Sequence, residues 1–347
     1  MKAIICHGYG APSDALGIED LDEPEVGDHD VLVDVHAACV NPADWHLIRG
    51  TPYLARFQIG LRRPNFTVPG SDFAGRVTAI GAAVTNVDLG DEVFGTTFMK
   101  GFGAFAAHVV VPESLLARKP DNVRFEEAAA VPLAALTALQ GLRDHGRIER
   151  GDKVLVIGAS GGVGTFAVQI AKSFGAEVTG VCSTKNADLV RALGADHVID
   201  YTTPCAWDDA DQYDLILQVA GRQTASDLRR RLTSDGTLVQ ISGDSDNRWF
   251  GPIGRIIAGQ LLSRLVSQTI TTFTVQPNRD DLELLASLLE HGQVQPIVDT
   301  TYQLGQFDEA IRHVEEGHTR GKVVLDVRTP VGPASAPLGQ RAAPPGP

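Results

Sequence analysis

The chain has 347 residues, of which 43% are hydrophobic and 21% are charged. This length and composition are typical of a folded protein with two domains and exclude a fibrous or largely disordered chain. The net charge of −13 argues against nucleic acid and anionic membranes as partners, because both would repel an acidic protein.

The cysteines indicate neither a disulfide framework nor a structural zinc site. All four are scattered along the chain without a Cys-x-x-Cys pair, which is typical of a reducing compartment. The apolar run at the N-terminus is too short for a secretory signal, and no run of about 18 apolar residues is present that would cross a bilayer. We therefore expect a cytoplasmic protein that does not associate with membranes.

The segment from Met1 to Asp121 contains short apolar runs between glycine and proline turns, with clear alternation in residues 30–37. This pattern predicts a compact, mostly antiparallel β domain. A helix is predicted to begin near Arg124, because two acidic residues would lie in its first turn, where the helix dipole favours them. The predicted strands are residues 2–6, 30–37, 74–81, 91–95 and 104–111.

Beyond Gly151 near-continuous apolar strands alternate with amphipathic helices. This order predicts a buried, doubly wound parallel sheet of the α/β class. The chain ends with two further strands, at 300–304 and 322–327. The predicted strands of the α/β part are 154–157, 177–182, 197–200, 215–219, 237–241 and 269–275, and the predicted helices are a first one ending at 174, then 187–193, 224–232 and 280–291.

Three further segments have distinct expected roles. Residues 253–266 have helical apolar spacing with two arginines, which fits a membrane-surface helix but favours a helix covering a substrate cleft. The β-branched run 269–275 would be the last strand of the sheet, and an unpaired edge predicts a homodimer through it. Residues 329–347 are rich in proline and alanine and lack aromatic residues, so we predict a disordered tail.

One glycine-rich turn joins the strand at 154–157 to the helix that follows. Glycines at such a turn let the backbone approach a diphosphate, and the amides at the helix start favour the anion. Gly161 and Gly164 match the second and third glycines of the GxGxxG fingerprint, whereas Ala159 occupies the first position. The predicted phosphate-binding residues are Ala159, Ser160, Gly161, Gly162, Val163 and Gly164.

Several motifs together resemble the medium-chain dehydrogenase/reductase superfamily, in its zinc-independent quinone oxidoreductase or enone reductase branch. They are the stretches 40–45 (VNPADW), 68–75 (VPGSDFAG), 90–95 (GDEVFG), the glycine turn and 321–325 (GKVVL), so the resemblance covers residues 1–328. It implies a GroES-like catalytic domain of residues 1–124, completed by 296–328. It also implies a Rossmann domain of residues 125–295 that binds NADPH.

Within this superfamily, alcohol dehydrogenases hold a catalytic zinc through a cysteine, the histidine of a Gly-His-Glu segment and a second cysteine. Here Asn41 stands at the first cysteine position, and the Gly-His-Glu segment reads Gly70-Ser71-Asp72. Neither Asn nor Ser is a usual zinc ligand, and the lone Cys39 nearby is better explained as a small buried residue. We therefore expect no metal.

The end of the second Rossmann strand predicts which dinucleotide binds. An acidic residue there would bind the ribose hydroxyls of NAD, but this chain has Cys182, followed by hydroxyls and a lysine. We expect Ser183 and Lys185 to contact a 2′-phosphate, with Lys185 as a solvated first-turn residue the alternative. The resemblance adds Tyr201 and the Lys322 of the closing Gly-Lys turn. NADPH is therefore favoured over NADH.

A site without a metal favours particular chemistry. Hydride addition to a quinone, or to a C=C bond conjugated to a carbonyl, needs only a polarised oxygen and a later proton. The resemblance implies that Asn41 contacts nicotinamide or substrate. Asp44 is a candidate catalytic residue or a turn or helix cap. His46 and Tyr53 are candidate pocket residues and proton donors that could equally be core, and solvent is an alternative donor.

Two other functions remain open from the sequence. One is an alcohol or aldehyde dehydrogenase that binds metal through unexpected ligands, and the other is a sensor that binds NADPH without turnover. The family usually has Asp where this chain has Gln218, at the carboxyl end of a strand beside the cofactor crevice. The sequence does not assign a role to that glutamine.

Overall fold

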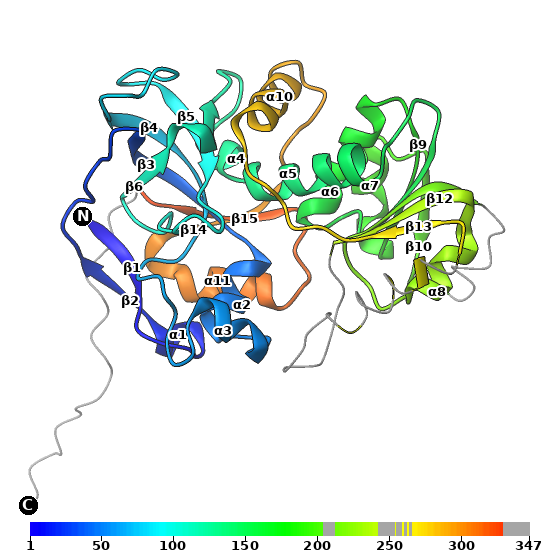
Figure 1. Ribbon diagram of the computed structural model, residues 1–347, viewed down its shortest axis with the longest axis horizontal. Helices are drawn as coiled ribbons and strands as arrows, with labels where there is room; N and C mark the ends of the chain where they lie inside the picture. Colours follow the sequence, from blue (N-terminus) through cyan, green and yellow to red (C-terminus); the bar gives the residue numbers. More distant parts are fainter. Residues whose placement is uncertain (204–211, 242–253, 255–258, 260–261, 264–265, 329–347) are drawn as a thin grey trace, which may run out of the picture.

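The computed structural model describes residues 1–203, 212–241, 254, 259, 262–263 and 266–328, which form two lobes around two sheets (Figure 1). The predicted helix at 253–266 lies largely, and the predicted tail at 329–347 wholly, outside the described residues. No helix in the described ranges combines the length and apolar character that crossing a membrane requires.

The first lobe is built on a mostly antiparallel seven-stranded sheet. Its strand order is β14-β15-β3-β4-β5-β7, and β6 also pairs with β3. Strands β14 and β15 come from the end of the chain, so the two ends of the sequence share one sheet. The strands are β3 (Asp30–Val40), β4 (Asp72–Ile80), β5 (Glu92–Thr96), β6 (His108–Pro112), β7 (Leu116–Arg118), β14 (Val298–Gln303) and β15 (Lys322–Asp326).

Shorter elements surround this sheet. β1 (Lys2–Cys6) and β2 (Leu16–Asp20) form a separate antiparallel pair. The helical elements of this lobe are α1 (Pro12–Ala15), α2 (Pro42–Arg49), η1 (Tyr53–Ala55), α3 (Arg56–Ile59), η2 (Glu113–Leu115), α4 (Phe125–Ala129), η6 (Leu304–Gln306) and α11 (Phe307–Glu315).

The second lobe contains a six-stranded sheet in which all paired strands are parallel. Its order β10-β9-β8-β11-β12-β13 reverses between β8 and β11, which is the arrangement of dinucleotide-binding folds. The predicted doubly wound α/β class is therefore confirmed. The strands are β8 (Lys153–Ile157), β9 (Glu177–Cys182), β10 (His197–Asp200), β11 (Tyr213–Gln218), β12 (Leu232–Gln240) and β13 (Thr269–Thr271).

Helices follow most of these strands, because the apolar strands need cover on both faces. They are α6 (Gly162–Ser173), η4 (Thr184–Asn186), α7 (Ala187–Ala192), α8 (Ala225–Leu228) and η5 (Arg229–Arg231). Helix α10 (Arg279–Glu290) packs instead on β7 and α5. Between the lobes in Figure 1 lies α5 (Pro132–Gln140), which is buried along its whole length and continues into the π-helical turn η3 (Gly141–His145).

Several predicted elements differ in extent from the structure; the strand at 30–37 continues to Val40, and the strand at 237–241 begins five residues earlier, at Leu232. The strand at 104–111 begins only at His108, because the residues before it bond to β1: Ile4 N–H donates to Phe105 O at 2.9 Å. The helix at 224–232 shortens to α8 and η5, since the chain enters β12 at Leu232. The strand at 269–275 stops at Thr271.

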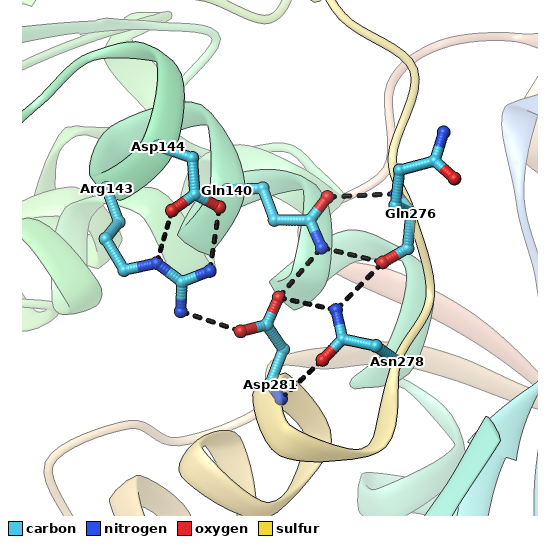
Figure 2. A network of polar contacts seen from close by, with 6 residues as sticks. All are labelled: Gln140, Arg143, Asp144, Gln276, Asn278 and Asp281. Atoms are coloured by element: carbon cyan, nitrogen blue, oxygen red, sulfur yellow. Dashed lines mark hydrogen bonds and ion pairs between the residues drawn. The ribbon is translucent and has the colours of Figure 1, made fainter. Parts of the chain in front are cut away.

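After β13 the chain reaches a polar network that ties it to α5 (Figure 2). Gln140 accepts a hydrogen bond from Gln276 N–H at 3.0 Å and donates one to Gln276 O at 2.8 Å. These bonds satisfy both backbone groups of Gln276 and fix the chain to α5 just before α10 begins.

Candidate functional site

The glycine turn lies at the carboxyl end of β8, where the sheet order reverses. Gly158 has φ +90°, a conformation that L side chains rarely adopt, and it turns the chain out of the strand. A Cβ on Gly164 would lie 2.0 Å from Gly158 O, so only glycine lets α6 pack this closely on β8. Gly164 therefore has the helix-packing role of the third glycine in the fingerprint.

The start of α6 fits a diphosphate. Gly161 is the N-cap residue and α6 has no side-chain cap, so first-turn amides lack the partner that a capping side chain supplies. A Cβ on Gly161 would meet nothing closer than Gly158 O at 3.5 Å, which leaves open space beside the turn. Bare amides, the positive end of the helix dipole and free space are what a phosphate requires.

The other residues of the turn have different surroundings. Ala159 is fully buried, and its N–H donates to Val181 O at 3.0 Å, so the absent first glycine is replaced by a residue packed into the sheet. Ser160 uses its hydroxyl within the protein, because its Oγ accepts from Asn186 Nδ2 at 2.9 Å. Val163 packs against the core in part. The predicted phosphate-binding site therefore consists of the backbone of residues 161–164.

The segment of residues 320–322, which we call the strap, crosses the glycine turn where β15 begins. Gly321 N–H donates to Ser160 O at 3.0 Å, and Gly161 and Gly321 form a parallel bridge. Gly321 has φ +83°, and a Cβ there would lie 2.2 Å from Ile297 O, so the strap needs glycine at this position. The Lys322 side chain lies along the turn, because a Cβ on Gly162 would come within 2.8 Å of its Cδ.

Lys322 connects the turn to a buried polar network in the first lobe. Its Nζ donates to Asn41 Oδ1, and Asn41 Nδ2 donates to Asp72 Oδ2 at 3.0 Å. The same oxygen of Asp72 accepts from Leu133 N–H, at the start of α5, at 3.1 Å. Asp44 accepts from Asn41 N–H at 2.7 Å and closes a capping box on α2. The predicted residues Asp44 and Lys322 thus meet at the predicted Asn41, together with Asp72, which is not among the predicted site residues.

Burial and charge govern this network. Asn41, Asp44, Asp72 and Lys322 are each at most 4% exposed. Burial raises the pKa of Asp44 to about 7, helped by the nearby Asp72 charge and opposed by the Asn41 amide and Lys322. Burial also raises the pKa of Asp72, while Lys322, Asn41 and Thr96 oppose that rise. Two carboxyls facing one ammonium favour a state in which one carboxyl keeps its proton.

The donor set around this network does not fit a catalytic zinc. Asn41 and Ser71 stand at two of the ligand positions. The Cys39 thiol bonds to Val323 O at 3.3 Å, and burial raises the pKa of Cys39 to about 12, so it stays protonated. Across the described ranges, no three His, Cys, Asp or Glu side chains are grouped as a metal site.

The two remaining catalytic candidates lie farther along the same segment. His46 is on α2 and stacks on Trp45, with ring centroids 3.5 Å apart. Burial lowers the pKa of His46, and its Nδ1 is buried with no hydrogen-bond partner among the described residues. Tyr53 lies in η1, where the Arg56 guanidinium is 4.8 Å from its ring centroid. Neither role predicted for them is tested by these contacts.

The predicted 2′-phosphate residues surround the carboxyl end of β9. Ser183 is the N-cap residue of η4, Lys185 is exposed in that turn, and Tyr201 is 55% exposed just after β10. Cys182 ends β9 and pairs in register with Asp200, whose carboxylate accepts hydrogen bonds from Thr184 and Thr202 side chains. A carboxylate is therefore present near the end of β9, but it already accepts hydrogen bonds from two threonine hydroxyls.

Gln218 acquires a structural explanation. It is fully buried at the carboxyl end of β11, its Nε2 donates to Gln223 O at 3.1 Å, and its Oε1 accepts from Gln240 Nε2 at 2.8 Å. The side-chain amide therefore ties the ends of β11 and β12 together. An aspartate there would have no amide to donate.

Sequence reasoning missed two polar residues of the site. Asp72 lies in the Gly70-Ser71-Asp72 segment that corresponds to zinc ligands in relatives, and an acid in an apolar run is itself a signal for a buried partner. Arg320 received no role. Its Nε donates to Asn186 Oδ1 at 2.7 Å, and its Nη2 donates to Lys185 O. The sequence contains no signal that places Arg320 beside β9.

Comparisons with known proteins agree with this geometry. Two family models match: an alcohol dehydrogenase GroES-like domain over residues 27–121 and a zinc-binding dehydrogenase over residues 193–325. The chain is 30% identical to a chloroplast envelope quinone oxidoreductase homolog of Arabidopsis thaliana, covering 94% of this chain and 98% of that protein. It is 34% identical to an NADPH-dependent alkenal/one oxidoreductase of the same plant, covering 94% of this chain and 79% of that protein.

A solved structure shows the same architecture over nearly the whole chain. The quinone oxidoreductase from Coxiella burnetii superimposes with a TM-score of 0.83 at 28% identity, covering 94% of this chain and 99% of the other. The fold is therefore a GroES-like N-terminal domain joined to a Rossmann-like parallel sheet, as the resemblance predicted. This chain belongs to the medium-chain dehydrogenase/reductase superfamily, in the branch of the quinone oxidoreductases and alkenal/one oxidoreductases.

Proposed function

We propose that the chain is an NADPH-dependent reductase that acts on a quinone or on the C=C bond of an α,β-unsaturated carbonyl. The observation that carries the proposal is the contact of Lys322 with Asn41, which joins the glycine turn to a buried polar network. The names of the relatives, one a quinone oxidoreductase homolog and one an NADPH-dependent alkenal/one oxidoreductase, support the same reaction class.

Each part of the site has a task in this proposal. The amides of Gly162, Val163 and Gly164 bind the diphosphate, and Ser183, Lys185 and Tyr201 bind the 2′-phosphate. The bound nicotinamide supplies the hydride. Lys322 places a positive charge beside the turn.

Asn41 holds that charge in position, because its amide oxygen accepts from Lys322 while its nitrogen donates to Asp72. Asp44 caps α2 and keeps Asn41 at the helix start. Both residues therefore position the ammonium rather than transfer a proton. We assign the proton that completes the reduction to solvent, since the carboxyl of Asp44 is buried and already engaged.

The proposal is tested by following NADPH oxidation with quinones, enones, aldehydes and, in the reverse direction, alcohols, in the presence of a chelator. We expect turnover with quinones or enones. As a binding control, Gly161→Asp should keep its melting temperature, since the turn has space for a side chain, but should lose NADPH binding because its charge faces the diphosphate.

The other outcomes separate the rival functions. Activity restricted to alcohols or aldehydes and abolished by the chelator would identify a metal-dependent dehydrogenase. Saturable NADPH binding without turnover on any acceptor would identify a sensor. Unchanged NADPH affinity in Gly161→Asp would remove the assignment of the glycine turn as the cofactor site.

A further inference from the structure

The strap carries a second cation to the end of β9, in addition to the lysine that the sequence places there. Arg320 is exposed, and its guanidinium is anchored at two points: Nε on Asn186 Oδ1 at 2.7 Å and Nη2 on the Lys185 carbonyl. Asn186 is itself fixed, because it is 6% exposed and donates to Ser160 Oγ at 2.9 Å. A chain of contacts therefore runs from the glycine turn to Arg320.

The backbone of the strap is equally constrained. Arg320 N–H donates to Asp299 Oδ2 at 3.2 Å, and Gly321 N–H donates to Ser160 O at 3.0 Å. Two anchored backbone groups and two anchored side-chain groups leave the guanidinium little freedom. A guanidinium held this way loses little further entropy when it binds an anion.

The guanidinium also has donors to spare. Of its five N–H groups, contacts within the described part of the chain use one on Nε and one on Nη2, which leaves three for a ligand. Lys185 and Ser183 lie on the same turn. Among the described residues, the carboxylate of Asp200 at the end of β10 is engaged by threonine hydroxyls, and that of Asp299 accepts from the Arg320 N–H. In a chain of net charge −13, the region around η4 therefore presents two cations, Arg320 and Lys185, to an anion.

We infer that Arg320 binds the 2′-phosphate of NADPH together with Lys185, and so helps to select NADPH over NADH. The inference rests on the proposed function, because it assumes that a dinucleotide occupies the glycine turn. It adds a residue more than 130 positions from the second Rossmann strand to a 2′-phosphate site that the sequence assigns to Ser183, Lys185 and Tyr201. Arginine suits a phosphate dianion because its planar fork donates two parallel hydrogen bonds.

A simpler role for Arg320 is to pin the strap to the second lobe. The two roles differ in what a neutral substitution does. Arg320→Gln keeps an amide N–H for the Lys185 carbonyl but removes the charge. A pinning role predicts equal losses for NADPH and NADH, whereas phosphate binding predicts a loss for NADPH alone.

The experiment measures dissociation constants for NADPH, NADH, adenosine 2′,5′-bisphosphate and ADP by fluorescence or calorimetry. We expect Arg320→Gln to weaken NADPH and adenosine 2′,5′-bisphosphate about tenfold and to leave NADH and ADP unchanged. Arg320→Lys should recover part of the preference. Arg312→Gln, an exposed arginine of α11 paired with Asp308, removes the same charge elsewhere and should change none of the four constants.

The outcomes distinguish this inference from the proposed function. Equal weakening of all four ligands by Arg320→Gln, or no effect on any of them, would overturn the assignment of Arg320. If Lys185→Gln lowers the NADPH preference in that case, the proposed cofactor stands. If the unmodified chain binds NADH as tightly as NADPH, the choice of NADPH itself fails, and the role of Arg320 fails with it.

Discussion

Asn41 shows how a residue suggested by a motif acquires a defined role only in the folded chain. Its backbone N–H, its side-chain oxygen and its side-chain nitrogen bond to Asp44, Lys322 and Asp72 respectively. A buried amide with all these groups satisfied holds one orientation. The contacts therefore favour positioning of Lys322 as the function of Asn41, where the motif alone implied contact with nicotinamide or substrate.

Asp44 should make stability depend on pH in the direction opposite to an ordinary ion-paired carboxylate. Its pKa is raised from 3.8 to about 7 by burial, so between these values the folded chain binds more protons than the unfolded chain. The free energy of unfolding must then fall as pH rises through this window. We expect Asp44→Asn, which can still accept from the Asn41 N–H, to reduce that fall by roughly 2–4 kcal/mol.

The measurement is urea unfolding of both proteins at several pH values from 4 to 8. Asp188→Asn is a matched control, because Asp188 is also an acid in the first turn of a helix, α7, but is fully exposed. Parallel pH curves for the unmodified chain and Asp44→Asn would contradict the raised pKa.

At the scale of elements, α5 is the helix that links the network in the first lobe to the sheet lobe. Its first turn donates Leu133 N–H to Asp72, and its last residue, Gln140, belongs to the network in Figure 2. There Asp281, at the start of α10, accepts from Gln140 Nε2 at 2.8 Å and from Arg143 at 2.7 Å. The helix is therefore held by polar contacts at both ends, although its sides are apolar.

Replacing Asp281 should loosen this link. Burial raises the pKa of Asp281, but hydrogen bonds from Arg143, Gln140 and Asn278 outweigh burial, so that the net direction is downward. We expect Asp281→Ala to lower the free energy of unfolding by about 2–3 kcal/mol at neutral pH, because charged hydrogen bonds are lost and Gln140 loses an acceptor.

The pH dependence identifies the cause. A lowered carboxyl pKa stabilises the fold above the unfolded value of 3.8, and this contribution is lost as pH falls through the folded value. The difference between the unmodified chain and Asp281→Ala should therefore shrink in acid. Asp144→Ala, which removes the other, more exposed partner of Arg143, should cost clearly less. Equal losses from the two substitutions would contradict this account.

At the scale of the whole molecule, the six-stranded sheet ends in β13, which pairs with β12 on one side. An edge strand offers unpaired backbone groups to another chain. We therefore keep the prediction of a homodimer, through an edge that is shorter than the sequence suggested.

Light scattering should give twice the chain mass of 37.0 kDa. Thr271→Lys places a charge at this edge and is expected to shift the measured mass towards that of one chain. A monomeric mass for the unmodified chain would rule out the dimer.

The sequence alone was sufficient for the class of fold, the glycine turn and the family, because these depend on local patterns: apolar strands of set length, glycines where the backbone must turn or pack closely, and short motifs. It also placed Asn41, Asp44 and Lys322 on the list of candidates. It could not show that they touch, because residues 41 and 322 are brought together only by the antiparallel pairing of β15 with β3.

Only the tertiary structure decided which charged and polar groups are in contact with one another. Asp72 became part of the site because β4 pairs with β3 and places its carboxylate beside Asn41 and the start of α5. Arg320 reached β9 because the strap crosses the glycine turn on its way into β15. Local propensity carries no information about such contacts, since they join residues between 31 and 135 positions apart and depend on burial, which raises the cost of every unpaired charge.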